Sequence, residues 1–241
     1  MSNIKISAVS YTNTKPFIDG ITRSDILHKI DLSLDIPSDC AAKVITEQVD
    51  IGLMPVGVLP LVPNGHIIGN FCIGSVGAVN SVFIFSHVPA NEIKTIRLDS
   101  HSRTSNLLAQ VLLKFYWKQE VLATTDPEVD ADAIVLIGDR TFGKAQDHPY
   151  AYDMGQAWMD LTGLPFTYAA WIANKPIPEQ FVAEFDAALK LGVEGIKALL
   201  PTLPAYDHFD MEDYLLHKLD FSLTDDKRKA IELFLSYIAR L

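Results

Sequence analysis

The stretch Thr95-Ile-Arg-Leu-Asp-Ser-His-Ser-Arg-Thr-Ser-Asn106 joins a short alternating strand to the amphipathic run Leu107–Trp117. The apolar residues of this run recur at helical spacing, which predicts a helix directly behind the strand. Ser102, Thr104 or Ser105 can cap that helix and leave its first N–H groups facing whatever lies above the strand end. Because a helix N-terminus favours negative charge, the junction suits an anion, most naturally a carboxylate.

The same strand-then-helix order recurs along the chain. The predicted strands are Ile4–Val9, Leu32–Ile36, Asp50–Met54, Ile67–Ile73, Ser81–His87, Thr95–Leu98, Val121–Thr124, Ala133–Ile137 and Tyr168–Ile172. Helices are predicted over Cys40–Gln48, over Asn106–Lys118 and through the chain after Pro178. This rhythm is typical of parallel strands joined by crossover helices, so we expect an α/β fold.

Two such sets of elements predict two lobes joined by two crossing segments, near Phe83–Pro89 and near Ala170–Pro176. Residues 1–86 and 176–241 would then form lobe I, and residues 87–175 would form lobe II as an insertion. Ligands of open α/β sheets bind beyond the carboxyl ends of the strands. Two such edges facing each other predict a ligand cleft between the lobes.

Composition narrows the functional classes. The chain of 241 residues has 20 basic and 30 acidic residues, a formal net charge of −10, and no basic run, which argues against a nucleic-acid partner. It has no apolar run of the roughly 20 residues that cross a membrane. Its first residues are too short and strand-like for a signal peptide, so we expect a soluble cytoplasmic protein without a membrane partner.

Motifs for metals and nucleotide cofactors are also absent from the sequence. The two cysteines, Cys40 and Cys72, lie 32 residues apart without the spacing of metal ligands, and they read as buried thiols. No glycine-rich phosphate-binding pattern occurs, and no HExxH or EF-hand spacing occurs. We therefore expect neither a metal nor a cofactor.

A family resemblance becomes specific at the end of the first strand. The phrase Ser10-Tyr-Thr-Asn-Thr-Lys-Pro16 resembles the SYLNxxP opening of chorismate dehydratase from the futalosine route to menaquinone. Further matches, in the family's order, are Pro37-Ser38, Asp50-Ile-Gly-Leu-Met-Pro55, Ser100-His-Ser-Arg-Thr-Ser105, Leu136-Ile-Gly-Asp139, Tyr152-Asp-Met-Gly-Gln-Ala-Trp158 and Thr162-Gly-Leu-Pro-Phe166. The resemblance covers most of residues 4–176. Thr12 stands where the family pattern has Leu, and Gly77-Ala78 where it has Gly-Pro.

The resemblance implies a type II periplasmic-binding-protein-like fold with the ligand cleft between its lobes. It also implies a cofactor-free hydro-lyase that removes water from the dicarboxylate chorismate and yields 3-[(1-carboxyvinyl)oxy]benzoate, acting as a monomer or weak homodimer. A sister enzyme forms 1,4-dihydroxy-6-naphthoate, but its Asp/Pro-rich opening and the His of its second lobe have no counterpart at the matching places here. The other alternative is a non-catalytic small-acid solute-binding protein. The missing export signal argues against it.

Three residues are predicted to act in catalysis. Asn13 lies at the tip of the first strand, where its amide can donate to a carboxylate or hydroxyl without carrying charge, although an Asn before Pro16 can also simply form a turn. Ser81 lies beside a glycine-flanked segment and is an alternative to Ser75 as the serine of the site. Asp139 follows an apolar strand and is the best carboxylate for acid–base work or positioning.

Further residues are predicted to bind the substrate, although turns, helix caps or the protein surface would also explain most of them. They are Thr12, Ser38, Ser75, Asn80, Arg103, Thr104, Ser105 and Asp153. His101 stands beside the predicted anion site, where it can orient the ligand.

Overall fold

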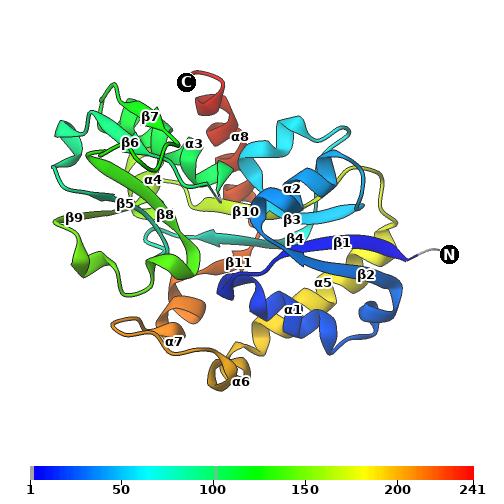
Figure 1. The fold of residues 1–241 in the computed structure, drawn as a ribbon. Helices are drawn as coiled ribbons and strands as arrows, with labels where there is room; N and C mark the ends of the chain where they lie inside the picture. Colours follow the sequence, from blue (N-terminus) through cyan, green and yellow to red (C-terminus); the bar gives the residue numbers. More distant parts are fainter. Residues whose placement is uncertain (1–2, 101) are drawn as a thin grey trace.

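A computed structural model describes residues 3–100 and 102–241, and it folds into two lobes, each built on one sheet (Figure 1). The strands of the first sheet, in spatial order, are β11 (Asp220–Ser222), β4 (His66–Ser75), β10 (Phe166–Ala173), β3 (Ile51–Pro55), β1 (Ile4–Val9) and β2 (Ile30–Asp35). Those of the second are β7 (Leu122–Thr124), β6 (Thr95–Arg97), β8 (Ala133–Ile137), β5 (Val82–Ser86) and β9 (Tyr150–Asp153).

Each sheet has a parallel part and an antiparallel part. Strand β1 pairs in parallel with β2 and β3, and β6 pairs in parallel with β7 and β8, which confirms the predicted α/β rhythm. Strands β4, β10 and β11 pair antiparallel in the first sheet, as do β5, β8 and β9 in the second. The sequence analysis missed β9 and β11, whose sequences Tyr150-Ala-Tyr-Asp153 and Asp220-Phe-Ser222 contain no run of β-branched apolar residues.

The chain passes between the lobes at two places. It leaves the first sheet at Ser75, the end of β4, and enters the second at Val82, the start of β5. It leaves the second sheet at Asp153, passes through helix α4 (Met154–Thr162) and re-enters the first sheet at Phe166. The crossings therefore lie in residues 76–81 and 154–165.

These positions correct the predicted crossings near Phe83–Pro89 and Ala170–Pro176. Strand β5 lies between β8 and β9 of the second sheet, and β10 lies between β4 and β3 of the first. Both strands therefore belong to the lobes opposite to those assigned by the division at residues 86 and 176. Both are almost wholly buried and apolar, and such a strand carries no pattern that reveals which sheet it joins.

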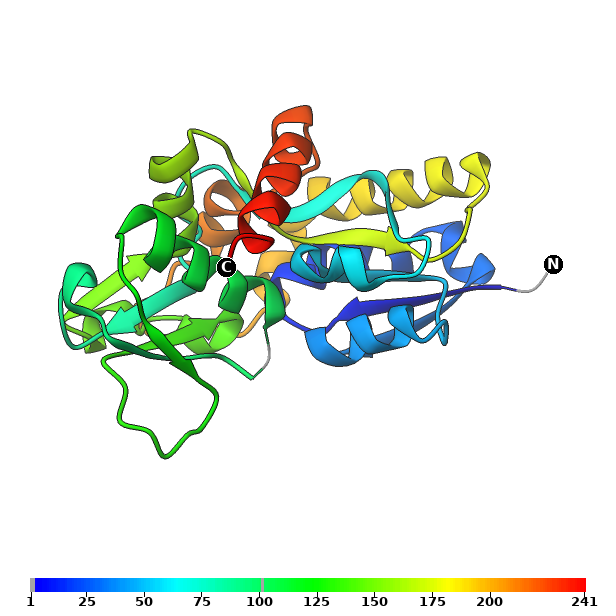
Figure 2. The same ribbon diagram turned by 90° about the horizontal axis from the view of Figure 1, so that it is seen from above.

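Helices cover both sheets and the junction between them. They are α1 (Lys15–Thr22), α2 (Pro37–Ile45), α3 (Arg103–Val111), α4, α5 (Glu179–Glu194), α6 (Ile196–Leu199), α7 (Met211–Asp213) and α8 (Asp225–Ile238). Helix α8 contacts β10 of the first lobe and α3 of the second, and from above it lies between the two lobes (Figure 2). Among the described residues, no helix is both long and apolar enough to span a bilayer.

Helices α1 and α5 approach closely through two glycines. A Cβ atom on Gly192 would lie 1.8 Å from the carbonyl oxygen of Pro16, and one on Gly20 would lie 2.1 Å from that of Ala188. Neither position has room for a side chain, so the glycines allow the C-terminal part of the chain to pack on the first lobe. The helical pattern predicted after Pro178, over Glu179–Leu191, near Val193–Leu199 and over Asp225–Leu241, corresponds to α5, α6 and α8. Between α6 and α8 the prediction is wrong in part, since residues 203–210 are irregular and β11 precedes α8.

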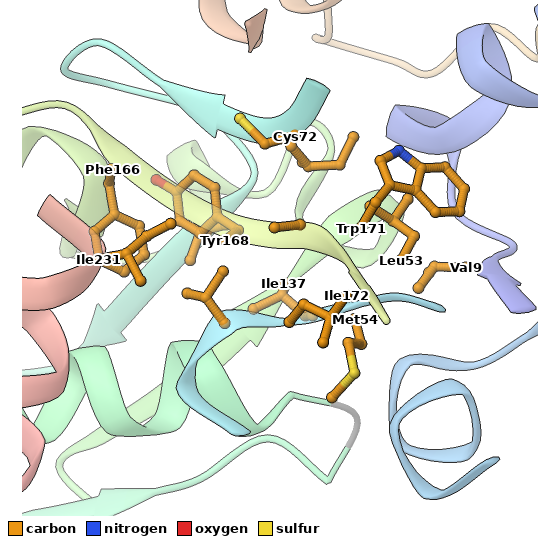
Figure 3. Close-up of a cluster of buried hydrophobic side chains, with 14 of the residues drawn as sticks. Val9, Leu53, Met54, Cys72, Ile137, Phe166, Tyr168, Trp171, Ile172 and Ile231 are labelled. Atoms are coloured by element: carbon orange, nitrogen blue, oxygen red, sulfur yellow. The ribbon is translucent and has the colours of Figure 1, made fainter. Parts of the chain in front are cut away.

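Strand β10 runs through the middle of the buried core. The side chains of Phe166, Tyr168, Trp171 and Ile172 spread from it toward both faces of the first sheet (Figure 3). Trp171 packs against Phe17, while Phe166 packs edge-on against neighbouring rings. The core thereby fixes the strand that carries Tyr168 to the junction of the lobes.

Candidate functional site

A narrow cavity lies where the two lobes meet, and both lobes line it. Its free volume of about 60 Å³ is room for a few water molecules. The lining residues are Val9, Tyr11, Asn13, Thr14, Pro37, Leu53, Pro55, Ile73, Val79, Ser81, Val82, Ser102, Thr104, Ser105, Ile137, Gly138, Tyr168, Ala169 and Leu219. The two crossing segments are the covalent links between the lobes, and the lobes would move about them in opening to admit a larger ligand.

The polar groups of this cavity are electrically neutral. Within residues 3–100 and 102–241, no carboxylate, imidazole, amine or guanidinium group lines it. Amide, hydroxyl and phenol groups stand instead among aliphatic side chains. Such fixed neutral donors in an apolar cavity can orient an acidic ligand and stabilise negative charge that develops on it.

Asn13, Ser81 and Tyr214 form a hydrogen-bonded set that we call the amide–hydroxyl group. Asn13 belongs to a 3-10 turn after β1, and Ser81 directly precedes β5. The phenol of Tyr214 donates to Ser81 Oγ at 3.0 Å and also hydrogen-bonds the Asn13 side chain. Burial raises the pKa of Tyr214, so the phenol stays neutral. Two residues predicted for catalysis thus lie together, joined by a tyrosine that sequence reasoning missed.

The alternative serine, Ser75, lies deeper in the protein. Its hydroxyl donates to the carbonyl of Gly77 at 2.9 Å and lies 3.2 Å from the Tyr168 phenol. Ser75 does not line the cavity, whereas Ser81 and Tyr168 do. Burial raises the pKa of Tyr168 well above its ordinary value, so this phenol is also a neutral group at the cavity surface.

The N-terminus of α3 supplies a second polar set, Ser102, Thr104 and Ser105, which we call the helix-end group. Ser102, one of the three predicted candidates, is the N-cap and accepts a hydrogen bond from the Ser105 N–H at 3.1 Å. The Thr104 hydroxyl accepts one from the Gly57 N–H of the first lobe at 3.0 Å.

All three members of the helix-end group line the cavity. Arg103, predicted to bind the substrate, is exposed and does not line it. His101 lies outside the described residues.

Thr12 and Asp139 join the two lobes through a contact that we call the interlobe latch. The Thr12 hydroxyl donates to the Asp139 carboxylate at 2.7 Å, and its N–H lies 3.2 and 3.3 Å from the two carboxylate oxygens. Tyr206 adds a side-chain hydrogen bond to Thr12. Asp139, predicted as an acid–base group, is thus turned toward the backbone of the first lobe and does not line the cavity.

The remaining predicted residues, Asp153, Asn80 and Ser38, do not line the cavity. Asp153 caps α4 and accepts four backbone N–H groups, from residues 79, 80, 155 and 156, at 2.7 to 3.1 Å. Burial raises the pKa of the Asp153 carboxyl, and these donors oppose that shift. Asn80 has a left-handed backbone with φ of 59° and lines a separate pocket. Ser38 lies in the first turn of α2, where its neighbour Pro37 lines the cavity instead.

No set of three or more His, Cys, Asp or Glu side chains that could hold a metal ion occurs in the described part of the chain. Burial raises the pKa of Cys40 to about 12 and that of Cys72 to about 11, so both stay protonated thiols. They lie in the core, as predicted.

Solved structures of similar fold come from several organisms. Protein AF1704 from Archaeoglobus fulgidus is 13% identical with a TM-score of 0.69, and the match covers 99% of this chain and 97% of that one. The Candida albicans CA3427 gene product, described as having the generic periplasmic binding protein fold, is 10% identical with a TM-score of 0.69, covering 100% and 91%. The alkanesulfonate-binding protein SsuA from Xanthomonas axonopodis pv. citri, bound to MOPS, is 13% identical with a TM-score of 0.61, covering 98% and 93%.

At such low identity these likenesses establish the fold alone, which is the expected two-lobed periplasmic-binding-protein-like fold. The family assignment comes instead from the sequence. A family model described as menaquinone biosynthesis matches residues 4–240, which is nearly the whole chain. The chain therefore belongs to the menaquinone biosynthesis family.

Proposed function

We propose that this protein removes water from chorismate to give 3-[(1-carboxyvinyl)oxy]benzoate, as a hydro-lyase in menaquinone biosynthesis. Family membership supports a role in that pathway. The observation that favours this reaction is the amide–hydroxyl group, which sets Asn13 and Ser81 at a cavity whose described lining side chains are all uncharged. We further propose that the enzyme acts in the cytoplasm, without metal or cofactor, as a monomer or weak homodimer.

The reaction needs stabilised negative charge more than it needs a strong acid or base. A proton leaves the ring carbon that is conjugated through a C=C bond to the ring carboxylate, and the electron pair spreads onto that carboxylate. The neighbouring hydroxyl then departs, a new C=C bond forms, and the ring becomes aromatic. One C–H and one C–O bond break, and the proton and hydroxide together make the water released.

The two polar sets then have different tasks. In our proposal Asn13 and Ser81 donate to the oxygens on which charge builds, and each such donor is worth about 3 kcal/mol of transition-state stabilisation. The helix-end group binds a carboxylate that is already charged in the substrate. The interlobe latch holds the lobes closed around the ligand, so that water is excluded during the reaction.

The sister reaction, which forms 1,4-dihydroxy-6-naphthoate from a cyclised futalosine, is the first alternative. The resemblance implies a catalytic His in the second lobe of that enzyme. That histidine has no counterpart at the matching place of this sequence, and this favours the dehydratase. A solute-binding protein of the same fold would hold an acid in this cavity without changing it.

One experiment separates these functions. The purified protein, dialysed against EDTA, is incubated with chorismate and with the cyclised futalosine, and the products are identified by mass spectrometry. Loss of the chorismate diene absorbance with release of the enolpyruvyl-oxy benzoate is expected. Turnover of the futalosine instead would establish the sister reaction. Calorimetric binding of chorismate with no product would identify a binding protein, and activity restored only by zinc or magnesium would reveal a metal site.

A further inference from the structure

We propose that Tyr214 is a positioning residue for the reaction, which holds the Ser81 hydroxyl in the orientation that lets it donate into the cavity. The inference deepens the proposed function and rests on it. Nothing in the sequence around Tyr214 marks it. It lies 133 residues from Ser81 and is the first residue of the helical segment Tyr214–Lys218, which directly follows α7.

The direction of the hydrogen bond between Tyr214 and Ser81 leaves the Ser81 proton free for another acceptor. The Tyr214 phenol donates to Ser81 Oγ, and both side chains are 1% exposed. A serine hydroxyl has one proton and two lone pairs, so a hydroxyl that accepts from Tyr214 keeps its own proton for another acceptor. Ser81 lines the cavity whereas Tyr214 does not. Tyr214 therefore lies on the side of Ser81 that is away from the cavity. By donating to Ser81 Oγ it leaves the Ser81 proton to point toward the cavity, and it does not contact a ligand itself.

Tyr214 is a constant donor in this arrangement. Burial raises its pKa, the hydrogen bonds with Ser81 and Asn13 lower it, and the negative charges of Asp139 and Asp153 raise it, with a net upward shift. A phenol of raised pKa stays protonated throughout the neutral range, so the donor to Ser81 does not change with pH there.

The ring of Tyr214 is held by packing that is independent of its hydroxyl. It packs edge-on against Phe142 at 5.1 Å and against Phe209 at 5.2 Å between ring centroids. Asp210 caps the short turn α7 before it by accepting from the Asp213 N–H at 2.9 Å. This turn lies below β11 in Figure 1. A phenylalanine at position 214 keeps these ring contacts and removes the hydroxyl alone.

The test is Tyr214→Phe, with Tyr237→Phe as the matched control. Tyr237 lies on α8 and packs against Phe115 and Trp158, away from the cavity. We expect Tyr214→Phe to lower kcat for chorismate about tenfold, with KM within about twofold of wild type, because the hydroxyl acts through the side chains it holds, Ser81 and Asn13, and not on the ligand. The control keeps wild-type kcat.

A double-mutant cycle identifies the path of the effect. If Tyr214 acts mainly through Ser81, Tyr214→Phe lowers kcat much less than tenfold in the Ser81→Ala background, and the loss that remains reports the hydrogen bond with Asn13. A full additional tenfold loss in the double variant would overturn the proposal, as would an unchanged kcat in Tyr214→Phe.

The positioning can also be tested without turnover, so that its failure is distinct from failure of the proposed function. Crystal structures of wild type and Tyr214→Phe are compared at the Ser81 side chain. A changed Ser81 rotamer or a displaced hydroxyl is expected, because the donor that fixes it is gone. An identical Ser81 position and hydrogen-bond set would refute the positioning role, whatever substrate the wild-type protein converts.

Discussion

The amide–hydroxyl group and the helix-end group line the same cavity but are held in different ways. Asn13 and Ser81 are fixed by another side chain, the buried phenol of Tyr214, and they come from segments far apart in the chain. Ser102 and Ser105 are fixed by the local geometry of a helix end. The N–H groups of a helix end stabilise a charge that is already present. Side-chain donors held in place by other side chains can instead be directed at an atom on which charge develops during a reaction.

We therefore expect substitutions in the amide–hydroxyl group to change mainly kcat and substitutions in the helix-end group to change mainly KM. Donors that act on developing charge change kcat, and donors that act equally on substrate and transition state change KM. Four substitutions test the comparison. They are given from the largest expected effect to the smallest: one in the amide–hydroxyl group, one in the interlobe latch, one in the helix-end group and one far from the cavity.

Asn13→Ala is expected to have the largest effect. Removing one donor to developing negative charge costs about 3 kcal/mol, so kcat should fall by about 10²-fold or more. The melting temperature should change little, because the amide at the end of β1 adds little to the core. Steady-state kinetics with circular dichroism measures both, and the exposed Asn91→Ala variant is the control. A folded Asn13→Ala variant with wild-type kcat would remove Asn13 from the catalytic role.

Asp139→Asn is expected to act on binding. The variant weakens the charge-assisted hydrogen bonds from Thr12, at a cost of about 1.4 kcal/mol, and so raises KM about tenfold while kcat stays within about twofold. Thr12→Val should give the same change, and the two changes should not add. A loss of kcat near 10²-fold with unchanged KM would instead make Asp139 an acid–base group.

Thr104→Val should weaken binding by less. The change removes a hydroxyl at the α3 N-terminus and leaves the Gly57 N–H without its acceptor, at a cost of about 1 kcal/mol. We expect KM to rise about fivefold with kcat nearly unchanged. Thr104→Ser, which keeps the hydroxyl, is the matched control. A kcat defect as large as that of Asn13→Ala would abolish the distinction between the two groups.

Asp132→Asn is expected to change the pH dependence of stability without affecting the site. The Lys94 N–H and then the N–H and hydroxyl of Thr95 hold the pKa of Asp132 below its ordinary value. This carboxylate therefore stabilises the fold above its unfolded pKa of about 3.9, and the contribution is lost as pH falls through the folded pKa.

Thermal unfolding at pH 7 and at pH 3 tests this. The variant should have a lower melting temperature than wild type at pH 7, and the difference should shrink at pH 3. Asp130→Asn, at an exposed neighbouring position, is the control. A difference that does not depend on pH would show that the Asp132 charge has no part in the effect.

The sequence by itself determined the features that depend on neighbours along the chain. The strands Ile4–Val9 and Ala133–Ile137 and a capped helix start near Ser102–Ser105 follow from local conformational preferences. Both strands are found, and α3 begins at Arg103 with Ser102 as its cap, three residues before the predicted start at Asn106. Asn13 was recognisable because it follows the first strand by a few residues within a family motif. Such signals act over a few residues, so they survive without knowledge of the rest of the fold.

Only the tertiary structure decided which sheet each apolar strand joins and what each polar side chain meets. Strands β5 and β10 are both apolar runs, and only their pairing with strands distant in the sequence places them in different sheets. Asp139 and Tyr214 met their partners, Thr12 and Ser81, across 127 and 133 residues. A hydrogen bond depends on distance and direction in space, which the folding of the whole chain sets, and neither side chain carries a local sign of its partner.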